Sequence, residues 1–254
     1  MDNLKYFAKT AQLFSNPEAT YWKNNGGRII GTQCSGIPEE IIHAAGILSM
    51  RVRAPGLQST KNADAHLHRI NCSYTRSILE MLMSGQLDFL DGFVTANTCC
   101  HHLRLAGEIE DKSRFRFLHY FQMNHSIGRG GREWLLEEMK KLIGHLEDIF
   151  QTTISDDALK KTISVYNKTR QLMTQLNELR KKEPPPVTGV EYMNIVLTGM
   201  SIPREKFNEK LEALLPALEK RQITNHRPRL LIMGGACDSP EFIDFIESKG
   251  ATVV

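Results

Sequence analysis

The fold of this chain is decided by the stretch Phe89-Leu-Asp-Gly-Phe-Val-Thr-Ala-Asn-Thr-Cys99-Cys100-His101-His102. Its residues 93–96 are apolar and β-prone, which predicts a strand that is covered on both faces. Asn97 and Thr98 end this strand, so Cys99 follows its carboxyl end, where open α/β sheets gather ligands and cofactors. The cysteine is therefore either a metal ligand or a free buried thiol, since free cysteine is among the most buried residue types.

The composition limits the classes of protein to which the chain can belong. Its 254 residues are 41% hydrophobic and 24% charged, as in ordinary soluble globular proteins of one or two domains. A formal net charge of +3 is too small to indicate a nucleic acid or an anionic membrane surface as partner. No stretch reads as a bilayer span or a signal peptide, so we expect a cytosolic, reducing location. Five cysteines, an odd number, also argue against a disulfide framework.

Further strand and helix patterns surround the first stretch. Strands are expected at residues 28–31, 48–53, 93–96 and 115–121. Helices are expected at residues 3–23, 38–46, 64–85 and 103–109. Because strands and helices alternate, the sequence predicts an α/β fold with a mostly parallel sheet and helices on its faces.

The rest of the chain predicts a helical middle third and the start of a second α/β domain. We expect an N-terminal α/β domain with the cysteine motifs at 1–131, a helical segment at 132–226 and the second α/β domain from 227 to 254. The last segment reads as a single β-α-β unit, which cannot bury both faces of its sheet. Either the sequence is a fragment, or a partner chain completes this sheet.

Three cysteines have a setting that suits metal binding. Cys34 and Cys99 each stand between a strand and a helix, and such positions lie on one edge of a parallel sheet. The positive N-terminus of a helix also favours thiolate over thiol. Cys72 falls inside the helix expected at 64–85, so its place relative to this edge does not follow from the sequence. Three converging thiolates would suit an iron–sulfur cluster or zinc, and the alternative is three unrelated buried thiols.

The neighbouring Cys99, Cys100, His101 and His102 cannot all bind one ion, because zinc ligands in a pair are usually about two to four residues apart. Cys99 is the better ligand candidate of the two cysteines. His101 or His102 could donate a proton to a substrate, or could be an ordinary surface histidine.

Motifs of two common enzyme classes are absent from the sequence. Ser35 lies on the loop before the helix at 38–46, but Gly-x-Ser-x-Gly and a suitable histidine–acid pair are missing, which argues against a serine hydrolase. The motif Gly-x-x-x-x-Gly-Lys-Ser/Thr is missing too, so the chain is not expected to hold ATP through such a loop.

Three stretches together resemble the 2-hydroxyacyl-CoA dehydratase / benzoyl-CoA reductase family. They are Gly31-Thr-Gln-Cys-Ser-Gly-Ile-Pro-Glu-Glu-Ile-Ile-His-Ala-Ala-Gly46, Cys72-Ser-Tyr-Thr-Arg76 with Met83-Ser-Gly85, and Asp91-Gly-Phe-Val-Thr-Ala-Asn-Thr-Cys99. Residues 229–254 are also similar to the start of the family's second α/β domain. Residues 51–53 and 97–99 look slightly closer to benzoyl-CoA reductase subunits than to the dehydratases.

The resemblance implies a subunit of two α/β domains that pairs with a homologous second subunit. It also implies a 4Fe–4S cluster, with cysteines from the motifs matched by Cys72 and Cys99 and from a later segment of the second domain. In this family a separate ATP-hydrolysing iron–sulfur activator injects one electron at low potential. The electron makes a ketyl-type radical anion of a CoA thioester, which then loses water or accepts hydrogen.

The sequence departs from the family pattern at two points. Cys100 stands where the family usually has aspartate, and the chain ends before the region expected to supply the third cysteine. Cys34 matches a cysteine of the family's double-cubane relatives, which hold a larger cluster, so it is the third candidate ligand. Ser35 matches a position beside the cluster in plain dehydratases, and Ser35 and His101 are the candidate catalytic residues.

The resemblance therefore predicts a subunit of an ATP-dependent iron–sulfur enzyme that reduces an aromatic CoA thioester, as benzoyl-CoA reductase does. The alternatives are a 2-hydroxyacyl-CoA dehydratase subunit, a double-cubane cluster reductase, a non-catalytic sister subunit, or a truncated product without a complete site. Neither a nucleic acid nor a membrane is expected as partner.

Overall fold

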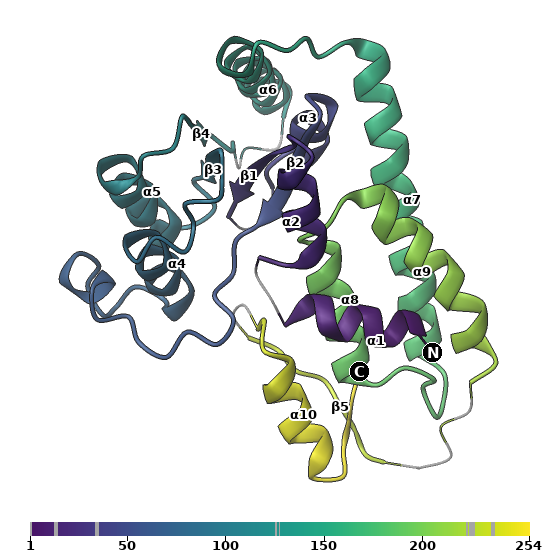
Figure 1. Cartoon of the computed structure of the whole chain (residues 1–254). Helices are drawn as coiled ribbons and strands as arrows, with labels where there is room; N and C mark the ends of the chain where they lie inside the picture. Colours follow the sequence, from purple (N-terminus) through teal and green to yellow (C-terminus); the bar gives the residue numbers. More distant parts are fainter. Residues whose placement is uncertain are drawn as a thin grey trace. The chain divides into compact units, whose positions relative to one another are not determined.

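The computed structural model describes residues 2–12, 15–33, 36–124, 126, 128–221, 223, 227–234 and 237–254. Two of the candidate site residues, Cys34 and Ser35, lie outside this part of the chain. The chain forms two compact units (Figure 1). One consists of Tyr21–Ile163, and the other of Met1–Thr20 together with Ser164–Val254.

The unit Tyr21–Ile163 is built on a four-stranded sheet. Its strands are β1 (Arg28–Thr32), β2 (Ile47–Arg51), β3 (Gly92–Ala96) and β4 (Phe117–Phe121). They are ordered β2-β1-β3-β4, and every neighbouring pair is parallel. The prediction of an α/β fold with a parallel sheet is therefore confirmed, with each expected strand in place.

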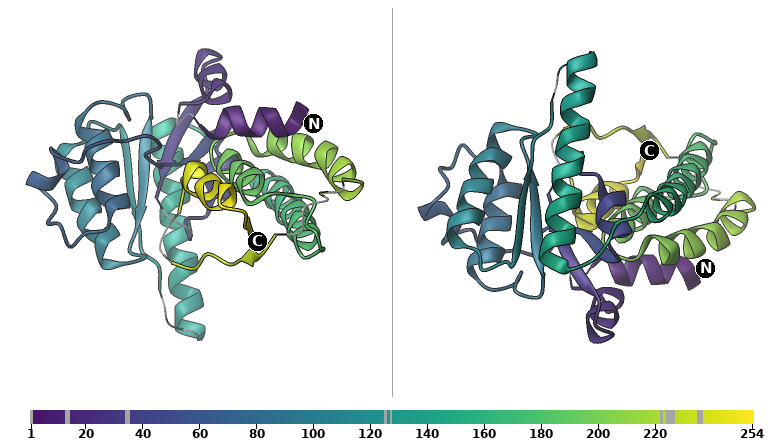
Figure 2. Two further views of the ribbon diagram at one scale, coloured as in Figure 1. Left: turned by 90° about the horizontal axis from the view of Figure 1, so that it is seen from below. Right: turned by 90° about the horizontal axis from the view of Figure 1, so that it is seen from above.

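Helices cover both faces of this sheet (Figure 2). On one face, α4 (Ser73–Met83) lies beside α5 (Cys100–Lys112), and α5 contacts β3. On the opposite face, α3 (Glu39–Ala44) and α6 (Arg129–Phe150) pack together. The carboxyl ends of the parallel strands consequently meet at one edge between two helical layers.

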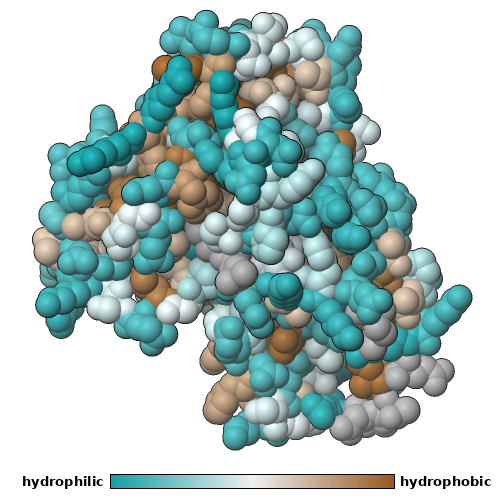
Figure 3. Space-filling model, viewed as in Figure 1, coloured by the Kyte–Doolittle hydropathy of each residue, from teal (hydrophilic) through white to brown (hydrophobic). Residues whose placement is uncertain are grey.

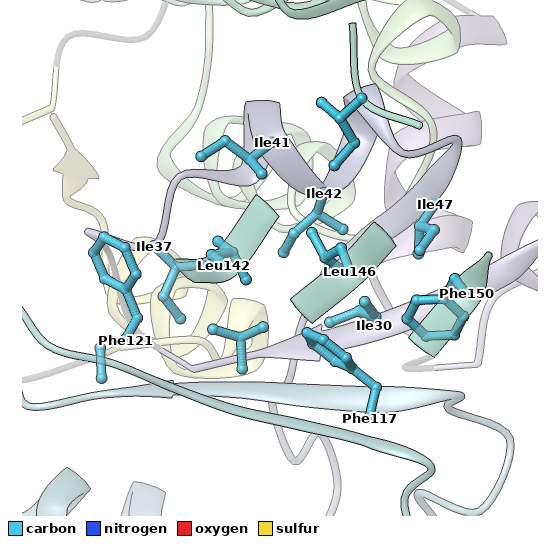
Figure 4. Packing of buried hydrophobic residues seen from close by; sticks show 13 residues of the cluster. Ile30, Ile37, Ile41, Ile42, Ile47, Phe117, Phe121, Leu142, Leu146 and Phe150 are labelled. Atoms are coloured by element: carbon cyan, nitrogen blue, oxygen red, sulfur yellow. The ribbon is translucent and has the colours of Figure 1, made fainter. Parts of the chain in front are cut away.

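Buried apolar side chains pack between the sheet and the helices α3 and α6. Ile30 of β1 and Phe117 of β4 both pair with Gly92 of β3, so their side chains project from the same face of the sheet, toward Leu142 and Leu146 of α6 (Figure 4). Each large apolar side chain buried in this way stabilises the fold by about 1.5–3 kcal/mol. This cluster holds α6 on the sheet.

On the other face, the sheet needs a glycine where β1 approaches β3. A Cβ atom on Gly31 would come within 2.8 Å of Leu90 Cδ1 and 2.9 Å of Phe93 Cδ2. The start of β1 is tied to the entry of β3 as well, because the Ile29 N–H donates to the Asp91 carboxylate at 2.7 Å. These contacts fix the register that aligns the strand ends.

The second unit contains α1 (Asp2–Ala11), α8 (Gly189–Gly199), α9 (Arg204–Glu219), β5 (Arg229–Leu230), α10 (Pro240–Ser248) and β6 (Thr252–Val253). α2 (Pro17–Asn24) and α7 (Asp156–Arg180) cross the boundary between the units. The expected β-α-β unit is present, since β5 and β6 are parallel and α10 lies between them in the chain. Figure 3 shows apolar side chains among polar ones over α10, where Phe242 and Phe245 are exposed.

The compact units group the chain differently from the three expected segments 1–131, 132–226 and 227–254. From the helical segment, α6 packs on the first sheet, and from the N-terminal segment, α1 packs against α8. As a statement about independent domains, the three-segment division stays a prediction.

The prediction of a single helix at 3–23 was wrong, because two helices, α1 and α2, occupy this stretch. Asn16 separates α1 from α2, and its side-chain Oδ1 accepts a hydrogen bond from the Ala19 N–H at 3.0 Å. Pro17 then takes the first position of α2, where a missing N–H does no harm.

Within the described residues, no helix is both long enough and apolar enough to cross a bilayer.

Candidate functional site

Cys99 stands at the carboxyl edge of the sheet, immediately before α5. It adopts an extended backbone conformation (φ −160°, ψ 168°) as the N-cap residue of this helix, and it is exposed. The turn before it is held by Asn97, whose Oδ1 accepts from the Met123 N–H at 2.6 Å and whose Nδ2 donates to the Met123 carbonyl at 3.1 Å. The position expected for Cys99 is thus the one observed.

Cys72 is the N-cap residue of α4, so the expectation that it lies inside a helix at 64–85 was wrong. Its backbone is extended (φ −61°, ψ 152°), and a short 3₁₀ turn, Ala63–Ala65, replaces the first part of the expected helix. The thiol is exposed, and its Sγ lies 3.5 Å from the hydroxyl of buried Thr75. Cys72 therefore has the same structural setting as Cys99.

The two cysteine-bearing helix ends lie beside each other. Nδ1 of His101, two residues after Cys99, is 3.3 Å from Oδ1 of Asn71, the residue before Cys72. The rings of Tyr74 and His102 are also in contact, with 5.7 Å between their centroids. These two contacts join the first turns of α4 and α5 and bring both thiols to one region of the surface.

A hydrogen bond from Tyr74 fixes α4 to the sheet. Its hydroxyl donates to the Val52 carbonyl at 2.7 Å, one residue beyond the end of β2. The N-terminus of α4 is thereby placed at the carboxyl edge, where Cys99 follows β3.

The electrostatics of these helix ends favour negatively charged sulfur. The N-terminus of a helix carries partial positive charge, which stabilises a nearby thiolate. Neither the first turn of α4 nor that of α5 contains an acidic residue that would neutralise this charge. Both thiols are therefore in a suitable setting for binding a metal or an anionic cluster.

The two histidines that follow the cysteines differ in their surroundings. His102 is buried, and its Nδ1 lies 2.5 Å from the Thr98 hydroxyl. Burial, and secondly the neighbouring His101, lowers the pKa of His102. His101 is only half-buried and is the one that a bound molecule could reach.

Cys100 begins α5 and is exposed. It lines an open pocket of about 780 Å³ with the exposed apolar side chains of Ile70 and Leu103.

The described residues alone do not complete a metal site. In this part of the chain, no three or more histidine, cysteine, aspartate or glutamate side chains form a group that could hold a metal ion. A 4Fe–4S cluster is typically held by four cysteines, of which Cys72 and Cys99 could be two. The exposed thiols and positive helix ends fit such a cluster, while the other ligands must come from elsewhere, with Cys34 a candidate outside the described residues.

Sequence reasoning missed Asn71 and Tyr74, which join the two helix ends. A signal was available, because the polar run Asn71-Cys72-Ser73 before an apolar helical pattern is typical of a helix start. Cys237 belongs to the other unit and is half-buried.

Fold and site together define an α/β chain that exposes two thiols at one edge of a parallel sheet. Residues 34–254 match the family model described as 2-hydroxyglutaryl-CoA dehydratase, D-component. The chain belongs to this family, and the resemblance inferred from the cysteine motifs is confirmed.

Several characterised proteins are similar to the chain. One of the subunits of benzoyl-CoA reductase from Thauera aromatica is 29% identical over 96% of this chain and 68% of its own length. The beta subunit of (R)-2-hydroxyglutaryl-CoA dehydratase from Acidaminococcus fermentans is 27% identical over 76% of this chain and 52% of its own length. The beta subunit of (R)-phenyllactyl-CoA dehydratase from Clostridium sporogenes is 24% identical over 98% of this chain and 68% of its own length. The chain thus spans about half to two thirds of the length of these relatives.

Proposed function

We propose that this chain is part of a cluster-bearing subunit of an enzyme that reduces an aromatic CoA thioester with single electrons at low potential. The observation that carries the proposal is the pair of exposed thiols, Cys72 and Cys99, at two helix N-termini joined by Asn71 and His101. The similarity to the Thauera aromatica benzoyl-CoA reductase supports the reaction class.

Cys72 and Cys99 would hold a 4Fe–4S cluster, with Cys34 as a further candidate ligand, or a larger double-cubane cluster if Cys34 takes part. When bound, such a cluster supplies one-electron transfer. The chain's own contribution is to present both thiols at the positive N-terminal ends of α4 and α5.

His101 is our candidate for moving a proton to or from the substrate. It is half-buried beside Cys99, and the contact with Asn71 restrains its ring. His102 is a poorer candidate because it is buried. Ser35 remains the second candidate catalytic residue, from the resemblance alone.

The proposal includes partners and a cellular location. The relatives are named as subunits, which supports a homologous second subunit for this chain. A separate ATP-hydrolysing iron–sulfur activator would supply the electron, in agreement with the missing phosphate loop in this sequence. Free thiols at Cys72, Cys99, Cys100 and Cys237 are consistent with a cytosolic location.

A second candidate function is dehydration of a 2-hydroxyacyl-CoA. It is favoured by the family description and by the dehydratase beta subunits among the relatives. The same electron transfer to a thioester would then be followed by loss of water in place of net reduction. A non-catalytic sister subunit is the third candidate.

One assay separates these functions. The natural complex, purified without oxygen, is mixed with the activator and ATP, and is then given either benzoyl-CoA or an (R)-2-hydroxyacyl-CoA. We expect reduction of benzoyl-CoA, whereas dehydration of the hydroxyacyl-CoA alone would select the second function. If the complex turns over but stays active when this chain's cysteines are replaced by alanine, the chain is a sister subunit. Iron-free complex without activity on either substrate would refute the proposal.

A further inference from the structure

The side-chain amide of Gln33 is buried without a hydrogen-bond partner. Gln33 is 0% exposed, and among the described residues neither its Nε2 nor its Oε1 has a partner. An amide removed from water without compensation costs free energy, and an apolar side chain of similar size would avoid that cost. Such a group requires an explanation, and a bound group that the protein encloses is one of the common ones.

Gln33 directly follows β1, the second strand in the order β2-β1-β3-β4, at the carboxyl edge. Thr32 pairs with Val94, which packs in the cluster beneath α6, whereas Gly31 faces Phe93 and Leu90. Because successive strand residues alternate between faces, Gln33 returns to the face of Gly31. This is the face opposite α6, where α4 and α5 lie (Figure 2).

Hydrogen bonds connect the backbone around Gln33 to the segments before both cysteines. Its N–H donates to the Val94 carbonyl at 3.4 Å, and β3 then leads to Cys99. The preceding carbonyl, on Thr32, accepts from the Val52 N–H at 2.9 Å. The Val52 carbonyl in turn accepts from Tyr74 in the first turn of α4, next to Cys72. Gln33 thus lies between β3, which leads to Cys99, and the residue after β2 to which the first turn of α4 is bonded.

We propose that the Gln33 amide N–H donates a hydrogen bond to a sulfur atom of the cluster held by Cys72 and Cys99. The inference rests on the proposed function, and it assigns a role to a residue that ligates nothing itself. A sulfur acceptor would satisfy the buried donor, which explains why an amide stands at this position. A hydrogen bond to cluster sulfur stabilises the reduced, more negative form and so raises the reduction potential.

The test uses the natural complex with Gln33→Leu, and Gln33→Met as an unbranched second variant in case leucine does not fit. Gln86→Leu is the matched control, because Gln86 is an exposed amide just beyond the far end of α4, where it donates to Ser84 at 3.0 Å. Iron and sulfide contents are measured first. The reduction potential is then obtained by redox titration followed by electron paramagnetic resonance, and the unfolding temperature is measured on iron-free protein.

We expect both Gln33 variants to keep the iron and sulfide of the wild type and to shift the potential to more negative values, while Gln86→Leu does not. Iron-free Gln33→Leu should unfold at a higher temperature than iron-free wild type, because it no longer buries an unsatisfied amide. An unchanged potential would overturn the inference while leaving the proposed function intact. Loss of iron from both folded Gln33 variants, or a lower unfolding temperature without iron, would also overturn it. Wild-type complex without iron would instead refute the proposed function, and the inference with it.

Discussion

On the α6 side of the first sheet, Phe117, Leu142 and Leu146 are fully buried against one another, whereas Cys72 and Cys99 are exposed at the carboxyl edge on the α4–α5 side. Both regions have two histidines near the sheet. Nδ1 of His119 on β4 lies 3.2 Å from Nδ1 of His145 on α6, while His101 and His102 follow Cys99 and Cys100 in the chain. The same residue type serves packing in one region and remains available for chemistry in the other.

If the proposed function holds, one parallel sheet divides stability and function between its two faces. The apolar side chains buried between the sheet and α6 stabilise the fold. The other region contains thiols and a buried amide that contribute little to packing. Substitutions in the two regions should therefore affect different measurements, one the unfolding free energy and the other the bound iron.

The largest effect is expected from the cysteines at the edge. Replacing Cys72 or Cys99 by alanine should abolish retention of iron, since each removes a proposed ligand, with little change in folding because both thiols are exposed. Cys237→Ala is the matched control and should keep the iron. Iron and sulfide analysis after anaerobic purification measures this. Iron lost with Cys237→Ala and kept with Cys72→Ala would mean that the ligand assignment is wrong.

A large effect on stability is expected from the packed side. Phe117→Ala should lower the free energy of unfolding of this unit by about 3–5 kcal/mol, because it leaves a cavity between the sheet and α6. Leu103→Ala, at an exposed leucine on α5, should change it by less than about 0.5 kcal/mol. Urea denaturation of the iron-free protein measures both. Equal effects of the two substitutions would contradict the assignment of the core to the α6 side.

A smaller effect is expected from acid, again on the packed side. Burial, and next the neighbouring His145, lowers the pKa of His119 to about 4. Of the charged groups nearby, Glu138 raises this pKa and Lys141 lowers it. Between about pH 6.5 and 4 the unfolded chain therefore binds a proton here that the folded chain does not. Stability should fall as the pH drops through this window, because protonation of this imidazole favours the unfolded chain.

Urea denaturation of the iron-free protein at pH 7, 5.5 and 4.5 measures this acid dependence. His119→Asn should flatten the dependence, since it removes the titrating imidazole. The same slope in the variant as in the wild type would show that His119 is not responsible.

The smallest effect is expected where α4 is bonded to the sheet. Tyr74→Phe removes the hydroxyl that donates to the Val52 carbonyl and should cost about 0.5–1.5 kcal/mol of stability. Because this bond also orients the helix that begins after Cys72, the variant should lose iron faster to a chelator than the wild type. If the variant and the wild type lose iron to the chelator at the same rate, the hydrogen bond of Tyr74 does not help to position the iron ligands.

Much of the fold could be predicted from the sequence, because its strands are apolar and bounded by clear turns. The run at 93–96 and the position of Cys99 after it follow from local pattern alone. The resemblance in the cysteine motifs was confirmed by the family match. In these places local preference and tertiary structure agree.

The start of α4 could not be predicted by helical periodicity. Leu67 and Ile70 continue the apolar spacing of the later helix, yet Leu67 is buried in a loop and Ile70 is exposed. The helix begins only at Ser73, where tertiary contacts of Asn71 and Tyr74 hold its end. The buried amide of Gln33 could not be foreseen either, because burial of a polar residue after a strand depends on which helices cover it.

The most direct test of the account is a crystal structure of the natural complex, purified and crystallised without oxygen, with anomalous scattering recorded at the iron edge. We predict an iron cluster that is contacted by the Sγ atoms of both Cys72 and Cys99 at the N-termini of α4 and α5. Iron bound elsewhere in the complex, with neither of these sulfurs touching it, would contradict the account.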